Sequence, residues 1–442
     1  MAKLFGDLPE HPAPLNFPCG GVARLRRPVR DEKEFRVCDL DALIGEEHPA
    51  RLIWAYVEKL DLRELEAGVK ARDGAPGMPQ TSFHLLFGLW LYATSQGVGS
   101  ARALERLCGS EAAYQWLCGG VSVNHRLLGE FRRDHGALVE RLLIEHAAGL
   151  SKAGLICLDV IAQDGVRVRA SAGSSSFRRR KTLGGELEKS KALVERLSKE
   201  LGDDPGASDR RARANRERAA LERLSRVEAA LEAQKEIEAL REKRLKTNRA
   251  AAEKQKEPRS STTDADARVM KMADGGFRPA YNAQFASDPG SGIIVAAGCE
   301  TTGSDRGLAE PMAQKIARDY GARPGAYLID GGFLLRPDIE AADAAGTRVY
   351  CPPSKSKSGR DPYEPGAGDS LPIAVWRKRM ASEEGKAVYK LRCRCELPHA
   401  RLRNLGLDHL LLRGKEKVLT WMRWFALAMN VMTGARLARQ AA

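Results

Sequence analysis

Two aspartates that each precede a glycine are the residues of this sequence with the clearest chemical potential. Asp164 follows an apolar run that begins at Leu155, and Asp330 ends the apolar part of the string GAYLIDGGF. A glycine after each acid lets the backbone turn sharply, so the carboxylate projects from a strand end where a phosphate can approach. Hard cations such as Mg²⁺ prefer carboxylate oxygens from separate elements, with positions left open for water and phosphate. The two pairs therefore predict a divalent-metal site for phosphoryl chemistry, which a third carboxylate from a helix would complete.

Simpler interpretations exist for these residues. A lone Asp-Gly pair more often marks only a turn, because the pair tolerates positive φ. Asp305 and Glu384 are further acids that could compete for such a role, and we interpret both as helix-cap or surface residues. The polar residues of the run from Tyr281 to Gln284 are interpreted as ordinary strand residues.

Strands and helices must hold the two acids in place. Residues 155–171 predict a hairpin, in which Asp164-Gly165 forms the turn between an apolar strand and a strand of alternating apolar and basic residues. The pattern then predicts a second hairpin, a helix, a buried strand, a helix and a strand, at residues 280–297, 305–320, 325–333, 338–345 and 347–351. This order is typical of an α/β fold with a mixed sheet and helices packed on it.

The region before the first strand has helical periodicity. Residues 39–150 predict several short helices with tight turns, and we expect them to form a separate all-helical domain. Asn124 is expected to cap a helix that carries Leu128 and Phe131 on one side and Arg132 and Arg133 on the other. Short helices with a basic last helix resemble a helix-turn-helix module that binds DNA, although an ordinary helical domain with a charged face fits equally well.

Two further segments differ in composition from the rest. Residues 1–38 are rich in proline and arginine and predict an extended basic arm. Residues 182–258 are rich in Glu, Lys, Arg, Ala and Leu, with a turn expected at residues 202–206. They predict an antiparallel helical hairpin of coiled-coil type, inserted into a catalytic domain that spans residues 151–435.

The composition indicates a polyanionic partner. Lys and Arg total 72 against 58 Asp and Glu, which gives a net charge of +14 and a pI near 9.4. The nine cysteines are scattered from Cys19 to Cys395 without the paired CxxC spacing of a zinc site, and no apolar signal segment opens the chain. No uninterrupted apolar run is long enough to cross a bilayer. We therefore expect a cytoplasmic protein with reduced thiols and no membrane partner.

Several strings, taken in order, resemble bacterial insertion-sequence transposases of the DDE class. In the helical region they are LLFGLWLYATSQGVGSARALERLC and HRLLGEFRR. In the remainder they are QDGVRVRAS, DADARVMK, YNAQFASDPGSGIIVAA, TTGSDRG, LIDGGF and EGKAVYKLRCRCELPHARLRNLGLDHLLLRGKEKV. The resemblance covers nearly the whole chain. It implies an RNase H-like catalytic domain that binds Mg²⁺, or Mn²⁺, through two aspartates and a glutamate.

Carried over by motif, the resemblance assigns the catalytic and metal-binding acids to Asp164, Asp330 and Glu396. Two departures follow the glutamate: Pro398 predicts a kinked helix, and His399-Ala400 replaces the aromatic-glycine pair that is commoner in the family. Arginines near these motifs and in the helical region are expected to contact the DNA backbone. They are Arg132, Arg133, Arg167, Arg169, Arg392, Arg394, Arg401 and Arg403.

The resemblance implies an enzyme that cleaves DNA at the terminal inverted repeats of an insertion sequence and transfers the freed strands into target DNA. Its partner would be double-stranded DNA, and bringing two ends together implies a homodimer or a higher assembly, associated with the nucleoid when bound. Two alternatives remain open. One is a catalytically decayed transposase that acts only as a DNA-binding protein, and the other is a metal-dependent nuclease that hydrolyses DNA without joining strands.

Overall fold

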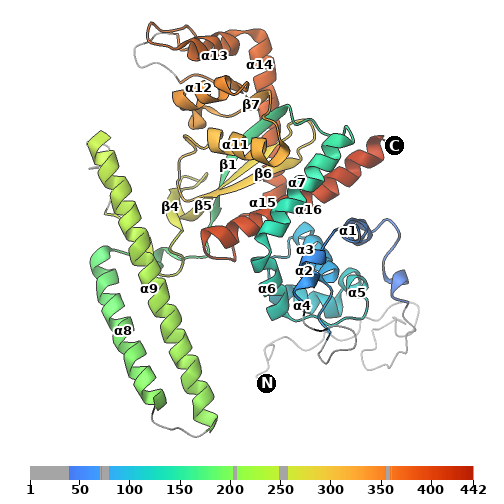
Figure 1. Ribbon diagram of the computed structural model, residues 1–442, viewed down its shortest axis with the longest axis vertical. Coiled ribbons are helices and arrows are strands. Elements are labelled where there is room, and N and C mark those ends of the chain that lie inside the picture. Colours follow the sequence, from blue (N-terminus) through green and yellow to red (C-terminus); the bar gives the residue numbers. More distant parts are fainter. Residues whose placement is uncertain are drawn as a thin grey trace, which may run out of the picture. The chain divides into compact units, whose positions relative to one another are not determined.

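A mixed β-sheet is the framework of the protein (Figure 1). The computed structural model describes residues 39–69, 71, 79–202, 207–247, 257–354, 359 and 361–441. The sheet strands are β1 (Val160–Arg169), β4 (Arg268–Lys271), β5 (Phe277–Ser287), β6 (Ile294–Glu300), β7 (Ala326–Leu328) and β8 (Arg348–Tyr350). Their order is β4, β5, β1, β7 and β8, and β6 also pairs with β5. β5 runs antiparallel to β1, whereas β1, β7 and β8 are parallel, so the sheet is mixed.

The predicted turn at Asp164-Gly165 is wrong. Both residues lie inside β1, which continues without interruption to Arg169. The reason is that β5 pairs with β1 over its whole second part, from Ala162 opposite Ser287 to Arg169 opposite Ala280. Ladder hydrogen bonds to a long neighbouring strand outweigh the turn preference of an Asp-Gly pair. The chain therefore leaves the sheet only after Arg169.

The other predicted elements of the sheet region are present. The second hairpin is β5 and β6, and the predicted helices correspond to α11 (Ala309–Tyr320) and α12 (Arg336–Ala344). After β8 come only helices, which are α13 (Leu371–Ala381), α14 (Glu383–Lys390), the 3₁₀ helix η4 (Leu391–Cys395), α15 (Glu396–Asn404) and α16 (Lys415–Ala441). This arrangement confirms the predicted fold class, an RNase H-like mixed sheet flanked by helices, with an N-terminal helical region and an inserted helical hairpin.

The insertion is a pair of long helices, α8 (Arg180–Gly202) and α9 (Ala207–Thr247), which pack against each other (Figure 1). Its two ends meet in a small antiparallel ladder of β2 (Phe177–Arg178) and β3 (Ser260–Ser261). Ser260 Oγ donates a hydrogen bond to the carbonyl of Ala230 in α9 at 2.6 Å, which ties the returning chain to the helix. The predicted arm at residues 1–38 and most of the predicted turn at 202–206 lie outside the described residues.

The N-terminal region is helical, as predicted. Asn124 caps its helix as expected, because its Oδ1 accepts a hydrogen bond from the amide of Leu127 at 2.9 Å. The elements of this region are η1 (Asp41–Leu43), α1 (Pro49–Val57), α2 (Arg63–Ala67), α3 (Phe83–Ser95), α4 (Ala101–Ser110), α5 (Ala112–Cys118), α6 (His125–Asp134) and α7 (Gly136–Lys152).

The last helix, α16, joins the helical region to the sheet. It packs against α3 and α7 on one side and against β6 on the other, and its apolar residues belong to a core that contains side chains from both regions. Asn430 in the middle of α16 is fully buried and pairs with the backbone of Ile294 in both directions, at 2.9 and 2.7 Å. From Leu40 to Ala442 the chain therefore forms one compact unit, and the domain division at residue 150 stays a prediction.

Arg132 is part of this joint, which contradicts its predicted contact with DNA. Its side chain is only 5% exposed, and its guanidinium carbon lies 4.2 Å from the ring centre of Trp90 and 4.6 Å from that of Trp421. Burial lowers the pKa of Arg132 to about 10, so it remains charged at neutral pH. The helix face that the sequence assigned to solvent is thus covered by α16, and Arg132 holds α3, α6 and α16 together through cation–π contacts.

We predict that Arg132→Ala lowers the stability of the protein by about 2–4 kcal/mol, because it leaves a cavity between two tryptophans and removes both cation–π contacts. The measurement is the thermal unfolding midpoint by circular dichroism. Arg133→Ala is the matched control, since Arg133 is partly exposed and its ion pair among the described residues is with its neighbour Asp134 at 2.6 Å. Its effect should be within about 0.5 kcal/mol. Equal effects of the two substitutions would contradict the structural role of Arg132.

Candidate active site

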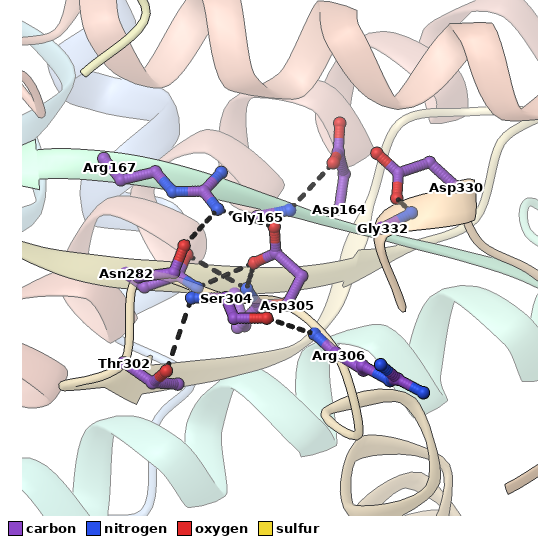
Figure 2. Close-up of polar contacts among 12 residues, drawn as sticks. Asp164, Gly165, Arg167, Asn282, Thr302, Ser304, Asp305, Arg306, Asp330 and Gly332 are labelled. Atoms are coloured by element: carbon purple, nitrogen blue, oxygen red, sulfur yellow. Dashed lines mark hydrogen bonds and ion pairs between the residues drawn. The ribbon is translucent and has the colours of Figure 1, made fainter. Parts of the chain in front are cut away.

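Parallel pairing of β1 with β7 places the two predicted aspartates side by side. The last registered pair is Ala162 with Leu328. Asp164 follows two residues later within β1, and Asp330 follows two residues after the end of β7, where it caps the 3₁₀ helix η3 (Gly331–Phe333). Because side chains alternate with a period of two, both carboxylates project to the same face of the sheet. Asp164 Oδ1 accepts a hydrogen bond from the amide of Gly165 at 2.9 Å, and Asp330 Oδ1 accepts one from Gly332 at 2.6 Å (Figure 2). The backbone thus fixes one oxygen of each acid.

A single arginine lies between the two carboxylates. Arg392 Nη2, which η4 carries, is 3.3 Å from Asp330 Oδ2 and 4.0 Å from Asp164 Oδ1. Burial disfavours the charge on Arg392, but the two carboxylates and the neighbouring Tyr389 outweigh it and raise the pKa of the guanidinium. Burial likewise raises the pKa of Asp164, with Arg392 opposing that effect. The two like charges are therefore held together by one shared cation.

His399 closes the other side of Asp164. Its Nδ1 lies 4.0 Å from Asp164 Oδ2, and its ring meets that of Phe285 edge to face with centroids 5.7 Å apart. Burial, together with the positive charges of Arg403 and Arg392, lowers the pKa of His399 to about 4. The imidazole is consequently neutral at pH 7, and it packs α15 against the strand without adding charge to the site.

Glu396 does not stand with the two aspartates. It is the first residue of α15 and is exposed, and its side chain makes no hydrogen bond or ion pair with any described residue. The predicted kink at Pro398 is absent, because α15 begins at Glu396 and proline in the first turn lacks only an amide that has no partner within the helix. The structure therefore brings Asp164 and Asp330 together, whereas Glu396 lies apart from them, one helical turn before His399.

The donor set fits a hard cation in part. Asp164 and Asp330 offer carboxylate oxygens from two elements, which is the ligand type that Mg²⁺ and Mn²⁺ favour. Within the described ranges, no group of three or more His, Cys, Asp or Glu side chains is arranged to hold a metal ion. The pair of aspartates fits such an ion, and the third protein ligand is not assembled around it.

The opposite face of β1 carries a polar network that the sequence interpretation missed (Figure 2). Asp305 accepts hydrogen bonds from Asn282 at 2.7 Å and from Gln284 at 2.8 Å, and it pairs with Arg167 at 2.8 Å. Its side chain is only 11% exposed, so the interpretation of Asp305 as a cap or surface residue is wrong. Gly165 faces this network, where a Cβ atom would lie 2.3 Å from Gln284 Nε2.

The same network continues toward β7. Gln163 donates to Gln284 Oε1 at 2.8 Å and accepts a hydrogen bond from the hydroxyl of Tyr327 at 2.7 Å. Buried polar groups that satisfy one another fix strand register, because a slip by one residue would leave them all without partners. The signal in the sequence was the alternation of polar residues at 282 and 284 opposite 165 and 167, which only the β1–β5 register brings together.

Apart from the buried Arg132, the predicted DNA-contacting arginines fall into two groups. Arg133, Arg167 and Arg392 are engaged in ion pairs with Asp134, Asp305 and the two site aspartates. The second group makes no ion pair with any residue that the structure describes, and its members remain available to an anionic partner. They are Arg169, Arg394, Arg401 and Arg403.

Two stretches of the chain match known protein-family models. Residues 257–431 match the model described as transposase DDE domain, and residues 38–134 match the model described as transposase domain (DUF772). Asp330 and Glu396 lie within the first match, whereas Asp164 precedes it. No curated protein and no solved structure matches the chain. No helix among the described residues is long and apolar enough to cross a membrane.

We predict that Asp164→Asn stabilises the metal-free protein at pH 7. The folded-state pKa of Asp164 lies above its ordinary value of 3.8, so its charge opposes folding above that raised pKa. The gain in thermal unfolding midpoint should shrink as the pH falls through the raised pKa. It should vanish below 3.8, where the protonated Asp164 of the wild type is as neutral as the asparagine of the variant.

Asp274→Asn is the control, because its effect on stability at pH 7 should have the opposite sign. The amide of Gly276 and the guanidinium of Arg278 hold the pKa of Asp274 below its usual value, so its charge favours folding at pH 7. This substitution should not raise the midpoint. An equal rise in both variants, or none in Asp164→Asn, would contradict the assignment.

We predict that Gly165→Ala destabilises the protein by about 1–3 kcal/mol, because the new methyl group would overlap Gln284 and Asp305. Gly109→Ala in α4 is the control, since nothing lies within 4 Å of its Cβ position and alanine favours a helix by roughly 0.5–1 kcal/mol. Urea unfolding followed by tryptophan fluorescence measures both changes. The changes in the free energy of unfolding are expected to have opposite signs. No change for Gly165→Ala would show that the side chains of Gln284 and Asp305 can shift to accommodate the methyl group.

Proposed function

Because the chain belongs to the insertion-sequence transposases of the DDE class, we propose that it cleaves DNA at the ends of its element and joins them to target DNA in a reaction that needs Mg²⁺ or Mn²⁺. The observation that supports this proposal most directly is the pair of carboxylates on neighbouring strands, Asp164 and Asp330, which share one arginine. Neighbouring carboxylates can both keep their charge where a cation compensates them, which supports a cation-binding role for this pair.

In the proposal, Asp164 and Asp330 hold the metal ion through the oxygens that are not engaged by the backbone amides of Gly165 and Gly332. When bound, the ion supplies Lewis-acid chemistry, which activates an attacking hydroxyl and stabilises the leaving oxygen. Glu396 is the proposed third ligand. It precedes His399 by three residues, so both side chains lie on the same side of α15, and His399 lies next to Asp164.

Arg392 has two proposed tasks at this site. Without a metal ion it compensates the two carboxylates, with an ion pair to Asp330 at 3.3 Å. Its Nε is buried and has no hydrogen-bond partner among the described residues, so part of the guanidinium is left to an incoming acceptor. A phosphate oxygen of the scissile bond would satisfy it, which places Arg392 next to the reacting group.

Exposed arginines provide the proposed contacts to the DNA backbone. Arg394, Arg401 and Arg403 flank the site on η4 and α15, and Arg169 ends β1. The net charge of +14 supports a large electrostatic contribution to binding. We further propose that the helical region, residues 39–150, reads the terminal inverted repeats with Arg133 near the DNA, and that two or more copies assemble on the two ends.

Two other functions are kept as candidates. The exposed position of Glu396, apart from the aspartates, favours a protein that retains only DNA binding. A metal-dependent nuclease would use the same acids and differ only in failing to join strands. Each gives a different product pattern.

The test uses the full-length protein, Mg²⁺ and a labelled DNA fragment that carries the element end. Wild type is expected to cleave the fragment and join it to target DNA, whereas Asp330→Asn should lose at least about 100-fold in rate, because it loses a metal ligand, and still bind DNA. Products are separated on a denaturing gel.

A matched pair of variants tests the third ligand. Glu396→Gln should lose cleavage, whereas Glu384→Gln, on the neighbouring helix α14, should keep it. Cleavage without joined products would identify a nuclease. Binding without metal-dependent cleavage by wild type would leave the DNA-binding protein as the function.

A further inference from the structure

A groove begins beside Asp164 and follows the second half of β1. It has a volume of about 670 Å³ and is lined at one end by Gly165 and Val166. The β4–β5 hairpin and the end of α15 form its walls, through Lys271, Arg278 and Arg403 among others. The groove thus starts at the residue that follows the first catalytic candidate and leads away from the site.

A second hollow extends this groove. It measures about 620 Å³ and shares Arg169 and Arg278 with the first. It continues past Ser171 to Arg413, which precedes α16. Because the two hollows share these two lining residues, they adjoin along β1, and we call them together the β1 groove.

The β1 groove is basic, and much of its positive charge is uncompensated. Arg169, Lys271 and Arg403 are exposed and make no ion pair with any residue in the described part of the chain. Arg413 donates from Nε to the carbonyl of Ser171 at 3.1 Å and has no acidic partner among those residues. The acid Asp274 is engaged by Arg278 at 2.6 Å. The exposed acid Asp408 also lines the groove, but basic side chains outnumber acidic ones along it, so a chain of phosphates would meet mainly positive charge.

An aromatic ring lies on the same wall. Phe277, the first residue of β5, lines the second hollow and is 68% exposed. An isolated exposed phenylalanine needs no explanation, but this one stands among cations in a groove whose lining includes Gly165, the residue after Asp164. Aromatic side chains in basic grooves are the usual platform on which unpaired bases stack.

We propose that the β1 groove binds a single DNA strand next to the scissile phosphate, with its phosphates on Arg169, Lys271, Arg403 and Arg413 and one base stacked on Phe277. This inference rests on the proposed function, which puts the scissile phosphate at Asp164. A duplex keeps its base faces inside the stack and offers none to Phe277, so the ligand is an unpaired strand.

The test compares binding of a labelled oligothymidylate of eight nucleotides with binding of a sequence-unrelated duplex of the same length, by fluorescence anisotropy without metal. Phe277→Ala should weaken single-strand binding about 5- to 150-fold and leave duplex binding unchanged. Val269→Ala is the matched control, because Val269 lies on the same hairpin, is 51% exposed and does not line the groove. It should change neither affinity.

A second measurement on the unaltered protein does not depend on any variant folding. A 2-aminopurine within the same oligonucleotide should lose fluorescence when it stacks on Phe277.

Arg169→Gln and Lys271→Gln should each reduce the salt dependence of single-strand binding by about 0.7 of a logarithmic slope unit. Single-strand affinity within twofold of wild type for Phe277→Ala, or equal losses on duplex and single strand, would overturn the proposal.

The cleavage assay separates this proposal from the proposed function. Wild type that cleaves element ends, combined with an unaffected Phe277→Ala, would reject the β1 groove and leave the transposase function intact. Wild type that fails to cleave, combined with a selective loss of single-strand binding, would support the groove and reject the cleavage reaction.

Discussion

Two negative charges held side by side need a positive charge between them, and this requirement organises the candidate active site. The β1–β7 register brings Asp164 and Asp330 together regardless of what else is bound, because ladder hydrogen bonds fix it. Arg392 satisfies the requirement in the described state, which places η4 and the start of α15 against the sheet. A divalent ion carries more charge and prefers the same oxygens. In the proposed function, Arg392 and the ion would therefore compete for one location, and this competition would link metal binding to the position of α15 and of Glu396.

The helical region and the sheet are coupled through α16. Its buried side chains reach both regions: Trp421 packs on the guanidinium of Arg132 in the helical region, and Asn430 binds the backbone of Ile294 in β6. Polar groups of this kind specify one geometry, because any other arrangement leaves them buried and unpaired. A DNA end held by the helical region would therefore meet the carboxylates in a fixed relation.

The sequence predicted the order of strands and helices because hydrophobic periodicity is local information. The Asn124 cap was predictable for the same reason, since its hydrogen bond closes within three residues. What failed was decided by distant segments. β5 turned the expected bend at Gly165 into continuous strand, α16 covered Arg132, and Asp305 found partners on β1 and β5. Motifs singled out Asp164 and Asp330, and the parallel β1–β7 register brings them side by side, although the glycine turn expected after Asp164 is absent. The contacts of Arg392 and His399 with them depended on where η4 and α15 dock.

The small ladder of β2 and β3 has a consequence for how this protein can change over evolutionary time. Residues 177–178 and 260–261 lie side by side, so the long helical pair between them leaves and re-enters the sheet region at nearly the same point. A segment with adjoining ends does not alter the distance that the surrounding chain must span. Its length, charge and binding partners can therefore diverge among relatives while Asp164, before it, keeps its position relative to Asp330, after it. The β2–β3 ladder thus allows the inserted helical pair to be exchanged without changing the rest of the fold.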